Sequence, residues 1–220
     1  PMVKYILPLL LTLSVASARS YRIDSLAISS TISRDGTVSI RETRTYNFNG
    51  SYSFAYLRLE KKLFKEAYDI RVFEGDKEYH YANSEEEHTF QIDNRKKSIR
   101  IKWFYQATDT KKVFTVSYRL RGALRIGEED TQFHWTYLGK GWKVRTRTMT
   151  VEQSFERELY EEDVWFVATG LSEDRLFTSF SGQAITLEAD NLSKNRRIKI
   201  NSIFPTSYLI DPVVNDHSLT

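Results

Sequence analysis

Alternation of apolar and polar residues dominates the chain and predicts β-strands. Residues 26–32 and 37–48 both alternate, and Asp35-Gly36 lies between them. An Asp-Gly pair between alternating runs is a strong hairpin signal, because the tight turn that joins such strands places both residues at positive φ. The sequence therefore predicts a β-hairpin here, with Asn49-Gly50 ending its second strand.

Further strand-like runs follow at short intervals, with turn residues between them. They cover residues 68–73, 78–81, 90–92, 98–105, 113–120, 131–137, 142–151, 164–167, 183–187 and 197–203. Residues 57–68 fit neither the helix nor the strand period, and residues 156–163 are short and acidic, so we interpret both as connections. Short strands at this spacing are typical of sandwiches. We predict an all-β fold, an antiparallel β-sandwich of many short strands with minor helical connections.

The N-terminal residues have the three-part pattern of a secretory signal peptide. A basic start at residues 2–4 precedes an apolar run from Tyr5 to Val15 and the small residues Ala16-Ser17-Ala18. The run has about 11 residues, fewer than the ~20 that span a bilayer as a helix. We predict a cleaved signal peptide over residues 1–18 and an exported domain on the periplasmic or cell-surface side of the membrane. An uncleaved anchor is the alternative.

Composition narrows the class of protein. The absence of cysteine from all 220 residues excludes a disulfide scaffold, a lipoprotein anchor, a thiol nucleophile and a Cys-ligated metal. The 32 Lys and Arg nearly balance the 29 Asp and Glu, so the net charge of +3 does not indicate a nucleic-acid partner. We expect one extracytoplasmic domain over residues 19–209 and a tail over 210–220. A sub-boundary is expected near Ser154, where alternation gives way to an acidic loop.

No group of residues specifies a reaction. His80, His88, His134 and His217 lack the spacing of a metal site. Gly139-Lys140-Gly141 lacks the length and following helix of a phosphate-binding loop, and favours a hairpin turn. We therefore predict no catalytic residue, no metal and no cofactor, and a protein that is not an enzyme.

Glu42 is the most distinctive carboxylate, because glutamate is disfavoured in the middle of a strand. It shares one strand face with Arg44 and Tyr46. One interpretation is a general acid or a binding carboxylate. The other, which we favour, is a cross-strand ion pair with an arginine such as Arg58 or Arg119.

Aromatic residues gather in runs at 103–105, 133–137, 142 and 165–166. On strands, alternate members of such a run face the core, so core packing is the favoured interpretation. The alternative is an exposed aromatic strip that stacks on sugar rings or docks a partner.

Several segments, in the same order along the chain, resemble the predicted bacterial membrane proteins grouped as domain of unknown function 2207. The segments are residues 35–48, 118–123, 133–144 and 204–205. Two residues within or beside these segments depart from the family pattern: Thr136 stands where Asn is common, and Arg145 stands where Pro is common. The family-like motif residues, to which no role is assigned, are Asp35, Gly36, Glu42, Tyr46, Phe48, Tyr118, Gly122, Trp135, Gly139 and Trp142.

The resemblance implies a β-rich N-terminal extracytoplasmic domain, usually followed by transmembrane helices and without an established activity. Residues 210–220 are then a tail truncated before membrane segments, or the end of a soluble variant. We predict a non-catalytic binding or interaction role at the cell envelope, with the membrane and an envelope protein or glycan as partners. The alternatives are a carbohydrate-binding module or weak glycoside hydrolase, and a structural spacer. The sequence assigns no oligomeric state.

Overall fold

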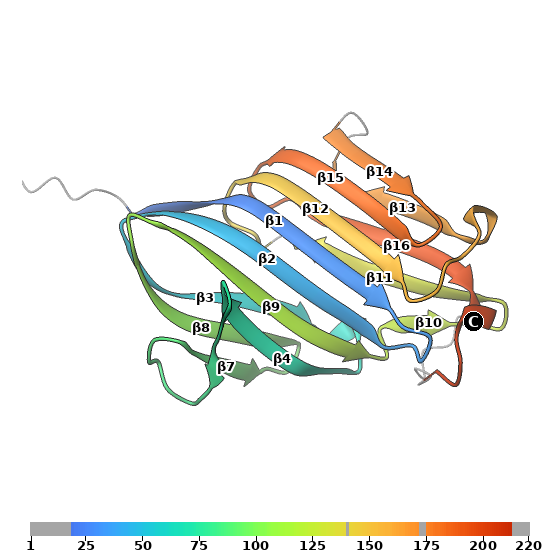
Figure 1. The fold of residues 1–220 in the computed structure, drawn as a ribbon, viewed down its shortest axis with the longest axis horizontal. Coiled ribbons are helices and arrows are strands. Elements are labelled where there is room, and N and C mark those ends of the chain that lie inside the picture. The colour runs from blue at the N-terminus through green and yellow to red at the C-terminus, as the bar shows by residue number, and fades with distance from the viewer. Residues whose placement is uncertain (1–18, 140, 172–174, 213–220) are drawn as a thin grey trace, which may run out of the picture.

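The computed structural model describes residues 19–139, 141–171 and 175–212, which form three β-sheets (Figure 1). The predicted signal peptide and most of the predicted tail lie outside these residues. The helical segments within them are short 3₁₀ helices, among them η1 (Lys61–Leu63), η2 (Glu161–Asp163) and η4 (Thr206–Tyr208). The predicted all-β fold with minor helical connections is confirmed.

One sheet is twice as wide as each of the other two. In spatial order it contains β14 (Leu176–Phe180), β15 (Ala184–Leu192), β12 (Thr146–Phe155), β1 (Ser20–Ile32), β2 (Val38–Asn49), β9 (Lys111–Arg121), β4 (Glu66–Glu74) and β5 (Lys77–Glu78). The second sheet contains β10 (Leu124–Ile126), β11 (Asp130–Leu138), β16 (Ile198–Pro205) and β13 (Trp165–Thr169). The third contains β3 (Ser51–Glu60), β8 (Ser98–Thr108), β7 (Thr89–Asn94) and β6 (His80–Tyr81).

The two four-stranded sheets cover different halves of the eight-stranded sheet (Figure 1). In one half, Tyr105 of β8 packs on Phe114 of β9 with ring centroids 4.6 Å apart. In the other half, Phe155 of β12 packs on Phe204 of β16 with centroids 5.2 Å apart. The molecule is therefore a sandwich of one continuous and one divided layer, with its apolar core between them.

Strand pairing is antiparallel at most positions, as predicted, but two pairs are parallel. β1 runs parallel to β12, with Ile28 opposite Val151, and the short strands β6 and β7 are also parallel. Parallel neighbours cannot be joined by a tight turn. Residues 33–145 therefore lie between two strands that are adjacent in the centre of the sheet.

The predicted hairpin forms, and β1 and β2 pair antiparallel along their length. Its turn differs from the prediction, because only Gly36 has a positive φ, of 79°, and Asp35 does not. The loop is longer than two residues: the Ser33 N–H donates to the Thr37 carbonyl oxygen at 2.8 Å. The Asp35 carboxylate accepts a hydrogen bond from the Thr37 N–H at 2.9 Å. The side chain of Asp35 thus supports the turn while its backbone keeps an ordinary conformation.

The interpretation of residues 57–68 as a connection is wrong for its first part. Residues 57–60 complete β3, with Leu57 and Leu59 buried. The pattern was ambiguous because this stretch joins the end of one strand, the helix η1 and the start of β4 at Glu66. β10 and β14 were not predicted either, since β10 has three residues and β14 is mostly exposed.

The segment before β12 also differs from the prediction. β12 begins at Thr146, so Trp142 lies in the preceding loop rather than in a strand. The hairpin turn predicted at residues 139–141 is wrong, because β11 and β12 belong to different sheets. This loop instead carries the chain from one layer of the sandwich to the other.

Candidate functional site

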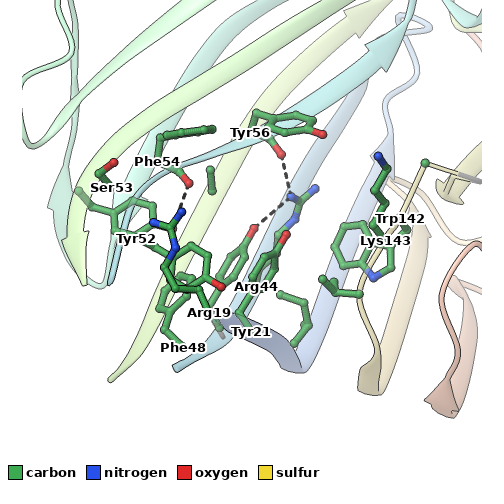
Figure 2. A pocket seen from close by; sticks show the side chains of 16 residues that line it. Arg19, Tyr21, Arg44, Phe48, Tyr52, Ser53, Phe54, Tyr56, Trp142 and Lys143 are labelled. Atoms are coloured by element: carbon green, nitrogen blue, oxygen red, sulfur yellow. Dashed lines mark hydrogen bonds between the residues drawn. The ribbon is translucent and has the colours of Figure 1, made fainter. Parts of the chain in front are cut away.

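A pocket of about 480 Å³ opens between the two layers of the sandwich (Figure 2). Its floor is the inner face of β1 and β2, and one wall is β3, which is an edge strand of its sheet. The loop of residues 141–144 forms another wall. The volume lies in the range of small-molecule sites in proteins.

The floor of the pocket follows directly from the alternation in β2. Every second residue of this strand is buried, so Glu42, Arg44, Tyr46 and Phe48 share its inner face. The first two residues are charged and the last two are aromatic. The strand therefore places a charged pair and an aromatic surface side by side under the pocket.

Glu42 and Arg44 form a buried ion pair, with 2.7 Å between Arg44 Nη2 and Glu42 Oε2. The Tyr118 hydroxyl donates to Glu42 Oε1 at 3.4 Å. Arg44 Nη1 donates to the Tyr56 carbonyl oxygen at 3.3 Å and to the Tyr46 hydroxyl at 3.5 Å (Figure 2). The guanidinium thereby connects β2 to the edge strand β3.

This arrangement refines the expectation for Glu42. The carboxylate is engaged in an ion pair, but its partner is Arg44 on the same strand and not Arg58 or Arg119. In a strand, side chains two residues apart lie on one face, and a long arginine side chain reaches back to its neighbour. The alternative was a general acid or a binding carboxylate. Both carboxylate oxygens of Glu42 are already hydrogen-bonded, one to Arg44 and the other to Tyr118, which does not favour that role.

The charge states of these groups are fixed by their surroundings. Burial acts to lower the pKa of Arg44, but the Glu42 carboxylate and the Tyr46 hydroxyl outweigh it and hold the pKa above its usual value. Burial, followed by the adjacent Glu42, raises the pKa of Tyr118 well above its usual range. Burial and neighbouring tyrosines raise the pKa of Tyr21 to about 12. Around neutral pH the pocket therefore contains a cationic guanidinium and protonated tyrosines.

Trp142 covers Arg44 from the loop side. Its ring centroid lies 4.9 Å from the Arg44 guanidinium carbon, a distance at which a cation and an aromatic face attract. The indole N–H donates to the Thr146 hydroxyl at 2.8 Å, and the Trp142 backbone N–H donates to the Gly139 carbonyl oxygen at 3.0 Å. These bonds fix the ring, so this wall of the pocket is preformed.

Aromatic side chains also line the opening of the pocket. Tyr21 is 38% exposed, and Tyr52 is half-buried. Phe54 and Tyr56 border the pocket through their backbone, and their rings lie on the outer face of β3, where Lys102 Nζ is 4.5 Å from the Phe54 ring centroid. The Tyr52 ring packs edge-on against Tyr21, with centroids 5.3 Å apart. Large apolar surfaces left exposed within a concave site are typical of binding sites.

Most of this aromatic lining was not predicted from the sequence. Tyr52, Phe54 and Tyr56 belong to β3, which was not recognised as a strand. Their recurrence at every second residue was the signal that predicts one. Tyr21 lies before the first alternating run considered, although it belongs to β1.

The motif residues separate into two groups. Six of the ten lie at or beside the pocket: Glu42, Tyr46, Phe48, Tyr118, Gly139 and Trp142. Two of the others form the β1–β2 turn, one directly follows β9, and one is buried in β11: Asp35, Gly36, Gly122 and Trp135. No role was predicted for these residues, and the structure gives their positions only.

The described residues contain neither a metal-site cluster nor a membrane-spanning helix. Residues 19–139, 141–171 and 175–212 contain no group of three or more His, Asp or Glu residues placed to hold a metal ion. No helix among these residues has the length and apolar composition that crossing a bilayer requires. His134 is half-buried on β11, and burial, with Lys199 nearby, lowers its pKa.

The sequence profile described as the N-terminal domain of a predicted membrane protein, DUF2207, matches residues 22–204. The chain belongs to the DUF2207 family. The resemblance suggested by the motifs is thus confirmed over nearly all of the described residues. No curated protein is significantly similar in sequence to this DUF2207 chain.

Several solved structures are similar to this DUF2207 domain at low sequence identity. A candidate protease of Parabacteroides distasonis is 8% identical with a TM-score of 0.50, over 83% of this chain and 40% of that protein. A candidate nutrient-binding protein of Legionella pneumophila is 10% identical with a TM-score of 0.49, over 84% of this chain and 67% of that protein. An M1 zinc metallopeptidase of Deinococcus radiodurans is 10% identical with a TM-score of 0.43, over 82% of this chain and 42% of that protein. At this identity the first likeness shows the fold alone, and this chain spans less than half of that protein.

Proposed function

We propose that this DUF2207 domain is a non-catalytic binding domain of the cell envelope, and that the aromatic pocket is its binding site. The observation that carries the proposal is the accessible aromatic surface of Tyr21, Tyr52 and Trp142 inside a concave site of about 480 Å³. Aromatic rings that remain accessible in a concave site are typical of binding sites. The Arg44–Trp142 contact preorganises the site, which lowers the entropic cost of binding.

The chemistry of the pocket supports binding rather than catalysis. The carboxylate nearest the floor, Glu42, is held by Arg44 and Tyr118. Hydrolysis of a glycoside ordinarily requires two carboxyl groups about 5–9 Å apart. The described residues that line the pocket include no aspartate or glutamate, so neither member of such a pair faces the cavity.

The proposed location rests on two independent features. The first is the signal-peptide pattern of residues 1–18, which directs the rest of the chain across a membrane. The second is membership of a family described as predicted membrane proteins. Together they support a domain on the periplasmic or cell-surface side, with the membrane as one of its partners.

A carbohydrate-binding module is the second candidate. The accessible rings of Tyr21, Tyr52 and Trp142 favour it, because aromatic faces stack on sugar rings. A glycan ligand and a protein ligand both use an aromatic pocket, so the experiment must offer both.

The test compares the full chain with two variants on a glycan array and on an array of extended peptides. Tyr21→Ala removes a 38% exposed ring from the pocket, and Tyr160→Ala removes a 74% exposed ring outside it. We expect binding of one ligand class, a loss of at least tenfold in Tyr21→Ala, and no change in Tyr160→Ala. Mass spectrometry of the bound ligand is expected to find it unaltered. Equal binding by all three proteins, or chemical turnover of the ligand, would contradict the proposal.

A further inference from the structure

The pocket combines positive charge with an absence of carboxylates among its described lining residues. Three cationic side chains line it, from Arg19, Arg44 and Lys143, and no described aspartate or glutamate does so. Its other polar side chains are tyrosine and serine hydroxyls, which both donate and accept hydrogen bonds. All of the charged groups in the lining are therefore cations.

The charge of Arg44 is balanced from below, but the charges of the other two cations are not. Glu42 neutralises Arg44 beneath the floor. Arg19 donates to the Ser51 carbonyl oxygen at 3.2 Å, and no described carboxylate lies within ion-pair distance of Arg19 or Lys143. Figure 2 shows these two residues on opposite sides of the Arg44 guanidinium. The opening of the pocket therefore has a net positive charge.

The lining also indicates which kind of group is attached to the anionic group of a ligand. Trp142, Tyr21 and Tyr52 present aromatic surface near the two cations (Figure 2). A small inorganic anion would leave this surface without contacts. A neutral sugar would leave Arg19 and Lys143 without an anionic partner. A ligand with both an anionic group and an apolar body satisfies both parts of the lining.

We infer that the pocket binds an amphiphilic organic anion, in which a carboxylate, sulfonate or phosphate group is attached to an aromatic or aliphatic body. This inference rests on the proposed function and names its ligand chemistry. The anionic group contacts Arg19 or Lys143, and the apolar body lies against the rings of Trp142, Tyr21 and Tyr52. The same chemistry is offered by a free organic acid and by an acidic residue beside an apolar residue in a peptide.

The experiment uses a matched pair of fluorescent probes with the full chain. 1-Anilinonaphthalene-8-sulfonate is an aromatic anion, and N-phenyl-1-naphthylamine has the same rings without the sulfonate. We expect the anionic probe to bind at least tenfold more tightly, and its affinity to fall as the salt concentration rises. Equal affinity for the two probes would overturn the inference but leave the proposed function standing. Binding of neither probe would contradict both.

Variants assign the binding to the pocket. The double variant Arg19→Gln, Lys143→Gln is expected to lower the affinity for the anionic probe about tenfold and leave the affinity for the neutral probe unchanged. The control Lys96→Gln, Lys97→Gln removes two exposed cations outside the pocket and is expected to change neither affinity. If both double variants lower the affinity for the anionic probe equally, the loss reflects the total charge of the protein, and the inference is wrong.

Competition then distinguishes the two sources of the ligand. 3-Phenylpropionate represents the free organic acid, and the blocked peptide acetyl-Glu-Phe-Glu-amide represents an acidic peptide. Each is compared with its neutral form, 3-phenylpropanamide or acetyl-Gln-Phe-Gln-amide, as a competitor of the anionic probe. We expect at least one acidic compound to displace the probe tenfold more effectively than its neutral form. Displacement by none of them would overturn the inference for biological carboxylates.

Discussion

Among single residues, the ion pair of Glu42 and Arg44 is the least ordinary, because two charges lie buried on an otherwise apolar strand face. Removing one partner of such a pair leaves the other charge buried without compensation, at a cost of about 3–5 kcal/mol. We predict that Glu42→Gln lowers the free energy of unfolding in urea by this amount. The side chain of the variant keeps its size, so the loss reflects charge rather than packing.

An exposed ion pair provides the matched control for this variant. Glu66 lies 2.9 Å from Arg121, and their side chains are 54% and 46% exposed. Such surface pairs contribute at most about 1 kcal/mol. Glu66→Gln is therefore expected to change the free energy of unfolding by less than this. Similar losses in Glu42→Gln and Glu66→Gln would show that burial of the first pair has no energetic consequence.

Asp24 makes stability depend on acidity. It occupies the bulge of β1, and its carboxylate contacts Lys111 at 2.9 Å and Arg22 at 2.8 Å. The hydrogen bond from Lys111 is the main cause that lowers the pKa of Asp24 to about 2, and burial opposes it. A carboxyl group whose pKa falls on folding stabilises the folded state only while it is ionised. Its contribution is complete above the unfolded pKa near 4 and is lost as the pH falls through about 2.

The corresponding prediction concerns the difference between the wild type and Asp24→Asn. We expect the wild type to be more stable at pH 6, by an amount that stays constant down to about pH 4 and then shrinks toward pH 2. Urea unfolding of both proteins at a series of pH values measures this difference. A difference that does not depend on pH would show that the carboxylate charge of Asp24 is not responsible.

At the scale of elements, the contact between the end of β13 and the start of β16 depends on the absence of a side chain. Gly170 follows β13 with φ of +126°, and a Cβ there would lie 1.9 Å from the Arg197 carbonyl oxygen. Gly75 has φ of +57° but nothing within 4 Å of its Cβ position. We predict that Gly75→Ala costs only the backbone term of about 1–2 kcal/mol. Gly170→Ala is expected to cost clearly more, since the two backbones must separate.

Thermal and urea unfolding of the two glycine variants check this prediction. The second measurement is hydrogen exchange in β13 and β16, which are paired from Trp165 to Thr169. Exchange is expected to accelerate there in Gly170→Ala and not in Gly75→Ala. Equal destabilisation of the two variants would mean that left-handed backbone strain alone explains both.

The sequence predicts an element well when its partners are close in the sequence, and poorly when they are distant. The antiparallel pairing of β1 with β2 was predicted correctly, because its pattern and its partners are local, although the turn is longer than predicted. The parallel pair β1–β12 was not, since no local signal links strands separated by residues 33–145. The pocket was missed for the same reason: Arg44, Tyr56 and Trp142 come from three segments that only the folded chain brings together.

For the whole molecule, the continuous eight-stranded layer predicts cooperative unfolding. The two four-stranded sheets share no strand, but each packs on the same wide sheet. Truncation of Phe114 in one half or of Phe155 in the other removes a buried ring, at a cost of about 3–5 kcal/mol. We predict that either alanine variant lowers hydrogen-exchange protection equally in β8 and in β16.

The comparison of β8 with β16 within each variant is the decisive measurement. If Phe114→Ala reduces protection in β8 while β16 keeps wild-type protection, the halves unfold independently. The double variant offers a second check. Because Phe114 and Phe155 lie in different halves, their effects on the free energy of unfolding are expected to add.

The parallel pairing of β1 with β12 also affects the order in which the chain can assemble during synthesis. A ribosome completes β1 and β2 early, but β12 is made only after residues 50–145. Until then β1 has a partner on one side only, and its other edge is open to pairing with another chain. A newly made chain therefore passes through a long interval in which its most central strand is a potential site of aggregation. Protection of that edge, by a chaperone or by delayed folding, is a requirement set by topology rather than by the stability of the finished domain.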